Sequence, residues 1–295
     1  MLARLGSIVA VGALLLGSGC VQPAAVESSK PVAYAPVMYT APEPSEPAVP
    51  PFIPEPLSDT EVSAEVDYLR AALSREVPQH VRSSPKSDAG WIARAQAAVA
   101  DAPLLLDRPQ LMVVVDRNPR VQEMRIVLAR PAGLPWDVIG GSEVSTGQPG
   151  RFDYYITPTG VFLHTDGILD YRALGTFNEN HVRGLGLKGM RVWDFGWQTA
   201  KKGWLVGNEE GEIRLLLHAT DPANLERRIG RQASKGCIRV PASMNRFLDV
   251  HGVLDADYER AAPEDAGIKA VLLPDRVPTK LAGNALVVVD SSGQS

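Results

Sequence analysis

The chain has 295 residues, with 30 Lys and Arg against 34 Asp and Glu, a formal net charge of −4 and no long basic run. This balance argues against nucleic acid as a partner. The sequence holds only two cysteines, Cys20 and Cys237, so it offers at most one disulfide.

The first 19 residues have the pattern of a secretory signal peptide. Arg4 precedes an apolar run over 8–16, and small residues lead up to Cys20. We therefore expect an exported protein of the periplasm or cell envelope. The sequence Leu-Gly-Ser-Gly before Cys20 resembles a bacterial lipobox, with the leucine one place too far away. It predicts a lipid anchor on Cys20 that holds the protein to a membrane; ordinary signal cleavage is the alternative.

Residues 20–57 form a lipid-anchor and linker segment that is rich in proline, especially over 42–56. Such a composition predicts a disordered, extended linker of about 3.1 Å per residue. Residues 58–106 read as a small helical segment, with Ser58-Asp59 and Ser87-Asp88 as the two helix starts. This segment is either a brace on the following domain or a module that touches substrate or partner.

Short strand-like runs with Gly and Pro turns begin after residue 106, including a hairpin over 111–128 and a strand over 136–144. They predict a mainly β domain over 107–255, a sandwich or barrel-like sheet with short helices. A helix is expected after Arg239, with Met244 and Phe247 on one face and Gly252 at its end. Residues 256–295 form a C-terminal extension, whose runs 268–273 and 285–289 are possible edge strands.

Residues 163–211 carry little periodicity but several Trp, Gly and Lys residues. Trp193 and its neighbours suit a flap that stacks on sugars or closes over a peptide, or they pack the sheet. His164 and His181 lack the HExxH spacing of a zinc protease, so no metal site is predicted.

Cys237 and His218 are the candidate catalytic pair. The apolar run 213–217 has strand composition and delivers His218 at its end, and a short helix capped by Asp221 can return the chain to Cys237. A free thiol has a pKa of about 8.5, which a neighbouring imidazolium can lower by several units. Gly236 lets the backbone approach a substrate, so that its N–H and that of Cys237 face an oxyanion. The alternative is a structural cysteine.

The pattern His218, Ser234-Lys235-Gly236-Cys237 and Arg239 resembles the L,D-transpeptidase catalytic domain, the YkuD-like family. Two upstream blocks, Ser145-Thr146-Gly147 and Thr157-Pro158-Thr159-Gly160, are similar to that family's strand pair. The three blocks cover about residues 107–250. The departure is Lys235, which stands where the family usually has a second histidine.

The resemblance implies a β-sandwich transpeptidase fold and a peptidoglycan substrate. Cys237 would attack a tetrapeptide stem and release D-alanine, and an amine of another stem or of a cell-wall protein would resolve the thioester. His218 would be the base, oriented by the carbonyl of Ala219, and no cofactor is needed. A carbapenem would acylate Cys237.

The residues expected on this basis to bind substrate are Ser234, Lys235, Arg239, Thr157, Gly160 and Trp193. Two alternatives remain open. One is a hydrolase on the same scaffold, either an L,D-carboxypeptidase or a cross-link-cleaving amidase. The other is a non-catalytic wall-binding lipoprotein.

Overall fold

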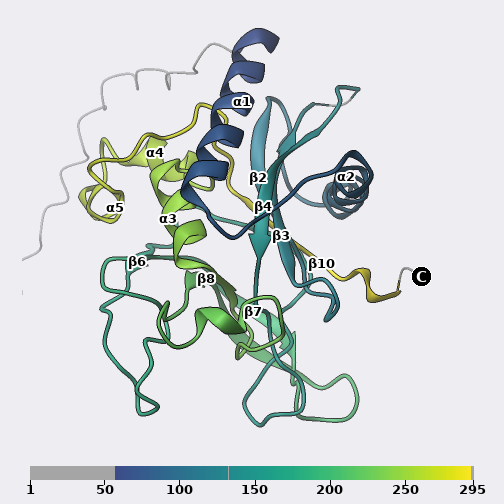
Figure 1. Ribbon diagram of the computed structural model, residues 1–295, viewed down its shortest axis with the longest axis vertical. Helices are drawn as coiled ribbons and strands as arrows, with labels where there is room; N and C mark the ends of the chain where they lie inside the picture. The colour runs from purple at the N-terminus through teal and green to yellow at the C-terminus, as the bar shows by residue number, and fades with distance from the viewer. Residues whose placement is uncertain (1–56, 132, 294–295) are drawn as a thin grey trace, which may run out of the picture. The chain divides into compact units, whose positions relative to one another are not determined.

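A computed structural model describes residues 57–131 and 133–293. The predicted signal peptide, the Cys20 anchor and nearly all of the Pro-rich linker therefore lie outside the described residues. The structure is mostly β-sheet, with two sheets and a few short helices (Figure 1). No helix within the described ranges has the length and apolar character needed to span a membrane.

The two sheets, here called sheet A and sheet B, have different orders. Sheet A runs β1-β4-β3-β2-β10-β5, and sheet B runs β6-β7-β8-β9. Most neighbours are antiparallel; β10 pairs with β2, and β8 with β9, in parallel. The strand bounds are β1 His80–Val81, β2 Gln110–Asp116, β3 Glu123–Ala129, β4 Asp137–Glu143, β5 Gly160–Leu163, β6 Tyr171–Arg172, β7 Arg191–Lys201, β8 Glu210–Ala219, β9 Ile238–Val240 and β10 Ala285–Val289.

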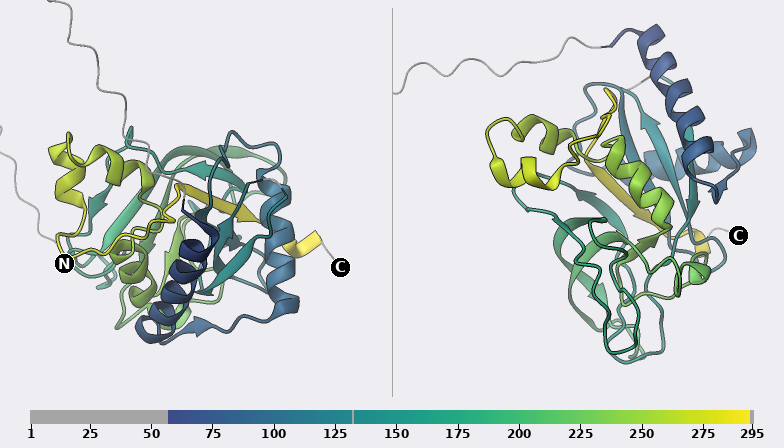
Figure 2. Two further views of the ribbon diagram at one scale, coloured as in Figure 1. Left: turned by 90° about the horizontal axis from the view of Figure 1, so that it is seen from above. Right: turned by 60° about the vertical axis from the view of Figure 1, so that its left-hand side comes forward.

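Helices cover both faces of sheet A (Figures 1 and 2). Leu111, Val113 and Val115 of β2 pack in the core that contains α1, whereas Met112 and Val114 pack in the cluster that contains α2. Both faces of β2 are thus buried, which is why its apolar run is continuous rather than alternating. The helices are α1 Asp59–Glu76, α2 Pro85–Val99, α3 Ala242–Val250, α4 Ala256–Ala261 and α5 Ala266–Val271, with 3-10 turns η1 Glu226–Arg228 and η2 Ser291–Gly293.

The predicted start of the first helix, Ser58-Asp59, is confirmed, whereas the second helix begins at Pro85 after its cap Ser84 and not at Ser87-Asp88. The Ser58 side chain and the Glu61 side chain form a reciprocal capping box at α1, and Ser84, three residues before Ser87, caps α2 with its hydroxyl. The helical segment is a brace, because α1 shares the core of both sheets and β1 pairs with β4. Residues 58–106 are therefore built into the same compact unit as the sheets, within Pro54–Ser295.

Two predicted elements differ from the structure. The run 268–273 was expected to be a strand, but α5 lies there because Asp265 accepts hydrogen bonds from the N–H groups of Gly267 and Ile268. The run 285–289 is a strand, yet β10 lies inside sheet A between β2 and β5 and is no edge. Residues 163–211, for which a flap and packing of the sheet were the two alternatives, contain β6 and β7 and so belong largely to sheet B.

Candidate active site

His218 and Cys237 lie on the face of sheet B that points away from the core. Leu215 and Leu217 of β8 are core residues, so alternation places His218 on the opposite face. His218 pairs in register with Arg239 of β9, and Cys237 precedes Arg239 by two residues. The Cys237 sulfur lies 3.8 Å from the carbonyl oxygen of Arg214, on the same part of β8. The parallel β8–β9 pairing therefore brings the two sequence-predicted residues to one face of adjacent strands.

The hydrogen bond of His218 fixes its tautomer. Nδ1 lies 2.6 Å from the carbonyl oxygen of Ala219, and because a carbonyl can only accept, Nδ1 carries the proton. Burial and then the guanidinium of Arg239 lower the pKa of His218 to about 4. The ring is therefore neutral at pH 7, with Nε2 unprotonated and able to accept a proton.

Cys237 is a free thiol whose pKa is raised above its usual value. Burial is the main cause, and the carboxylate of Asp194 adds to it. The N–H groups of Leu216 and Cys237 and the charge of Arg239 act in the opposite direction without overcoming burial. The expectation of a lowered thiol pKa is thus wrong for this resting structure, in which the thiol and the imidazole are both neutral.

The hydrogen bonds among residues 57–131 and 133–293 include none between the Cys237 sulfur and the His218 ring; the sulfur instead donates to the Arg214 carbonyl. The pair is therefore on the same face without being in contact. Proton transfer between them requires the thiol to turn from Arg214 or a water to bridge the two.

The loop before Cys237 is tied by Ser234. Its hydroxyl donates to the Cys237 carbonyl at 2.5 Å and accepts from the Gly236 N–H at 3.1 Å. This corrects one expectation, because a Gly236 N–H that donates to Ser234 is not free to hold an oxyanion. Ser234 is buried and shapes the loop; its expected contact with substrate stays a prediction.

Gly236 is required by space and by backbone geometry. Its φ is 131°, and a Cβ there would lie 2.9 Å from the Ile213 side chain and 3.3 Å from the Tyr155 Cβ. A larger residue would push the Cys237 loop away from β8.

The two upstream motif blocks form the scaffold of this loop. Thr157 is fully buried; its hydroxyl donates to the Gly236 carbonyl at 2.7 Å and accepts from the Gly147 N–H at 2.9 Å. Ser145 exchanges backbone hydrogen bonds of 2.9 Å with Arg239. Thr157, expected to bind substrate, therefore supports the loop from behind.

Lys235 and Arg239 point in different directions. Lys235 Nζ lies 3.0 Å from Asp153 and near the ring of Tyr154, in an exposed ion pair. Arg239 is half-buried, donates to the Ala233 carbonyl at 3.0 Å and has no carboxylate within ion-pair distance among the described residues. Its charge acts on both His218 and Cys237, which places an uncompensated cation beside the pair.

Two expected substrate contacts lie elsewhere. Trp193 is completely buried in the core and its Nε1 approaches Asp255 at 3.4 Å, so it has no surface to offer a substrate. Gly160 begins β5 and pairs with Val288 of β10, in the other sheet. The structural alternative for Trp193, packing of the sheet, is the one observed.

The sequence analysis did not identify three residues that lie near Cys237, namely Tyr171, Asp194 and Arg214. Tyr171 pairs with Val192, and Val192 pairs with His218, so a row of paired residues crosses sheet B from Tyr171 to Arg239. Asp194 binds Arg214 at 2.8 Å and raises the pKa of both Tyr171 and Cys237. A β-bulge between Asp194 and Trp197 breaks the alternation of β7, which is why no strand signal marked this segment.

A hollow of about 530 Å³ adjoins this row. Tyr171 contributes to its lining, together with Leu174, Phe177 and 184–186. Gly186 lies against Ala219, the residue that orients His218, because a Cβ there would be 2.9 Å from the Ala219 Cβ. The hollow therefore borders the His218 side of the candidate site and has the size of a small peptide pocket.

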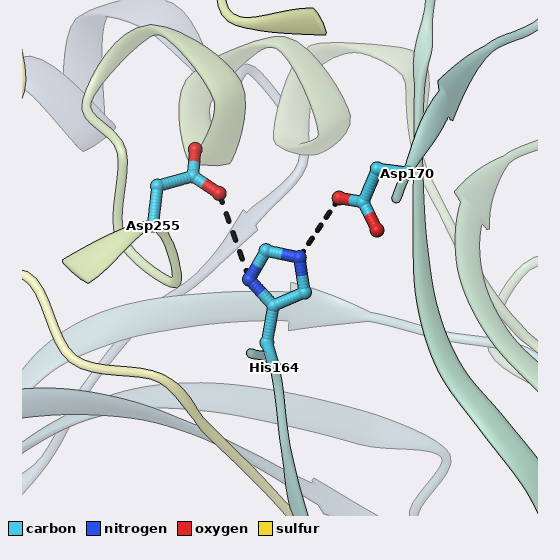
Figure 3. A group of neighbouring side chains, drawn as sticks. All are labelled: His164, Asp170 and Asp255. Carbon is cyan, nitrogen blue, oxygen red and sulfur yellow. Dashed lines mark hydrogen bonds and ion pairs between the residues drawn. The ribbon is translucent and has the colours of Figure 1, made fainter. Parts of the chain in front are cut away.

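A second group of titratable residues lies behind β6 and β7. The side chains of His164, Asp170 and Asp255 converge in the interior (Figure 3). Their spacing is that of a metal site, but both nitrogens of His164 already face acceptors, the Leu254 carbonyl at 2.8 Å and Asp170 at 2.9 Å. Arg191 supplies a cation to both carboxylates. The group is an ion-pair cluster and does not fit a metal.

Comparison with known proteins adds no relative: neither a scan against protein-family models nor a search of curated proteins gave a match.

Proposed function

We propose that this protein is a cysteine acyltransferase of the L,D-transpeptidase type that acts on peptidoglycan stem peptides in the cell envelope. The observation that carries the proposal is the shared outer face of β8 and β9, where His218, with Nε2 unprotonated, lies on the same side as Cys237. The uncompensated guanidinium of Arg239 beside them suits a substrate carboxylate.

The first half-reaction forms a thioester. The Cys237 sulfur attacks the carbonyl of the third stem residue, and the thiol proton passes to Nε2 of His218. The C–N bond to the terminal D-alanine then breaks, and His218 returns the proton to the leaving amine. The Cys237 N–H is the remaining backbone donor of the loop for the oxyanion, since that of Gly236 is engaged by Ser234.

The second half-reaction restores the thiol. An amine of a neighbouring stem, or of a cell-wall protein, attacks the thioester carbonyl, the C–S bond breaks, and the amine proton returns through His218 to sulfur. With water in place of the amine the same steps give hydrolysis. The low pKa of His218 keeps it a base in the resting state and a strong acid once protonated.

The test is incubation of the purified protein with tetrapeptide muropeptides, followed by mass spectrometry. Cross-linked dimers support transfer, whereas tripeptides alone support the hydrolase. A carbapenem should add its mass to wild type and to a Lys235→Ala control, and not to Cys237→Ala. Absence of both products and adduct overturns the proposal.

A non-catalytic wall-binding protein is the second candidate. Two observations favour it: the raised pKa of the Cys237 thiol and the lack of a hydrogen bond to His218. It predicts retention of muropeptides without any covalent adduct, measured by sedimentation with purified cell wall, and equal retention by Cys237→Ala.

A further inference from the structure

A continuous series of contacts joins the buried ion-pair cluster to the candidate nucleophile. Asp170 Oδ1 accepts the backbone N–H of Asp194 at 2.9 Å, the Asp194 carboxylate accepts Arg214 Nε at 2.8 Å, and the Arg214 carbonyl accepts the Cys237 thiol at 3.8 Å. Asp170 also leads directly into β6, where Tyr171 begins the row that ends at Arg239. Asp170 thus connects the buried cluster with Asp194, through a hydrogen bond, and with Tyr171, its neighbour in the chain.

The other carboxylate oxygen of Asp170, Oδ2, is hydrogen-bonded by two buried side chains. Oδ2 accepts His164 Nε2 and Arg191 Nε, both at 2.9 Å. Figure 3 shows the His164 ring between Asp170 and Asp255. All three bonds to Asp170 come from donors, so its carboxylate must be ionised and must keep both oxygens as acceptors.

His164 is a cation in this arrangement. Its Nδ1 faces the Leu254 carbonyl and its Nε2 faces the Asp170 carboxylate, and because neither partner can donate, both nitrogens carry protons. Against the effect of burial, the carboxylates of Asp170 and Asp255 raise the pKa of His164. Against the same effect, His164 and Arg191 lower the pKa of Asp170. Buried charges of this kind cost desolvation energy, and an apolar replacement often stabilises a fold equally well. The cluster therefore calls for a reason beyond stability.

We propose that Asp170, held by His164 and Arg191, is a positioning residue for the Cys237 site, setting the location of Asp194 and through it the Arg214 backbone that receives the thiol. This inference deepens the proposed acyl transfer and rests on it for its catalytic meaning. The part that concerns the thiol's environment can be measured without any peptidoglycan substrate.

Asp170→Asn is the decisive variant, because it keeps the volume but leaves one acceptor oxygen for three donors. Whichever way the amide turns, its NH₂ group faces either the Asp194 N–H or the pair His164 and Arg191. The Asp194 carboxylate, which raises the thiol pKa, is then displaced. The titratable and charged groups on this face of the sheet around Cys237 are Tyr171, Asp194, Arg214, His218 and Arg239.

The expected result has two parts that move in opposite directions. The pKa of Cys237, followed by iodoacetamide alkylation against pH, falls by about half a unit, which is about threefold faster alkylation at pH 8. Acylation by a carbapenem slows by about tenfold in its maximal rate, with the half-saturating concentration little changed, because geometry rather than binding is lost.

The matched control is Asp255→Asn. It removes a carboxylate that is equally buried in the same cluster but has no contact with Asp194. Its thiol pKa and acylation rate should stay at the wild-type values even if its stability falls. Near-UV circular dichroism verifies that each variant is folded.

A double-mutant cycle tests the route. If Asp170 acts through Asp194, Asp170→Asn combined with Asp194→Asn shifts the thiol pKa no further than Asp194→Asn alone. If Asp170→Asn does not fold, His164→Gln takes its place: it keeps a donor toward Asp170 without the charge, and a smaller shift of the same sign is expected. If Asp170→Asn folds and has the wild-type pKa of Cys237 and the wild-type rate of carbapenem acylation, the inference is overturned. Failure of wild type to acylate at all overturns the proposed function, while the thiol pKa still decides the positioning.

Discussion

His218 and Arg239 occupy the same register position of β8 and β9, so a permanent cation lies beside the imidazole on one face of sheet B. Burial, together with the charge of Arg239, holds the pKa of His218 at about 4. Protonation of His218 would place two positive charges side by side, with the imidazole buried. The ring consequently stays a free base over the whole neutral range.

The first prediction concerns the acid side of the rate profile. If His218 is the base, the rate of Cys237 acylation at subsaturating carbapenem should fall only as the pH approaches about 4, and not near 6.5. Stopped-flow acylation from pH 3.5 to 8 measures this. A midpoint above pH 6 would show that His218 is protonated more easily than its surroundings imply.

The same shift affects stability. Because the folded-state pKa of His218 lies below the unfolded value, the unfolded chain binds the proton first, and stability falls as the pH drops from about 6.5 to about 4. The loss amounts to about 3 kcal/mol for this residue alone. The His218→Gln variant should not show this loss. Urea titrations at pH 7 and pH 4 give the free energy of unfolding of both proteins, and the difference between variant and wild type should change by about 3 kcal/mol between the two pH values.

The second prediction concerns the thiol. Since burial raises the pKa of Cys237, iodoacetamide should react slowly at pH 7 and increasingly above about pH 9, rather than well below pH 8. Subtraction of the rate of Cys237→Ala corrects for Cys20, the other cysteine of the chain. Rapid alkylation at pH 6 would mean that the thiolate is already stabilised at rest.

The third prediction is for Ser234→Ala. The change leaves the Gly236 N–H and the Cys237 carbonyl without their partner, and Ser234 is buried. The free energy of unfolding should fall by about 1–3 kcal/mol, and carbapenem acylation should slow as the loop loosens. Ser63→Ala, which removes an exposed hydroxyl bonded within α1, is the control and should stay within about 0.5 kcal/mol.

The fourth prediction compares two glycines. A Cβ on Gly147 would lie 2.0 Å from the Tyr155 carbonyl oxygen, whereas one on Gly184 meets nothing within 4 Å. Gly147→Ala should therefore cost more than about 2 kcal/mol and displace the loop that Thr157 holds, while Gly184→Ala should be nearly neutral. Thermal unfolding of the two variants side by side gives the answer; equal midpoints would contradict the packing of the Ser145-Thr146-Gly147 block.

The fifth prediction concerns Lys235. Its ion pair with Asp153 is exposed, with about 60% of each side chain accessible, so Lys235→Ala should change stability by less than about 1 kcal/mol. Lys235 is not one of the groups that shift the pKa of Cys237. The alkylation profile should therefore be unchanged; a shift of half a unit would give Lys235 a direct electrostatic role.

The candidate pair could be found from the sequence because strand composition, strand end and cysteine spacing are local signals. The run 213–217 is indeed part of β8, and the turn after His218 does contain Asp221, which accepts from the N–H groups of Ala223 and Asn224. The expected helix there is reduced to the single 3-10 turn η1. Local chemistry thus placed the residues, while the length of the connection was set by the packing of β9.

The rest depended on contacts distant in sequence. Asp170, Asp194 and Arg214 are ordinary charged residues until the β6–β7–β8 pairing brings them together. Trp193 is buried because it lies in the strand β7. The β-bulge in β7 breaks the alternating pattern, so the sequence did not indicate a strand there. The expected oxyanion role of the Gly236 N–H failed because a side chain three residues before Cys237 turned back on the loop, and no sequence pattern specifies that rotamer.

The position of β10 has a consequence for the order of folding. This strand, one of the last elements of the chain, lies between β2 and β5 and supplies the pairing that connects them. A chain that emerges gradually from a ribosome or an export channel can form the β2–β3–β4 meander early, but it cannot attach β5 until residues 285–289 have emerged. Attachment of β5 to the rest of sheet A should therefore follow the synthesis of residues 285–289, and truncation before Ala285 should trap a chain with two unpaired strand edges that invite aggregation.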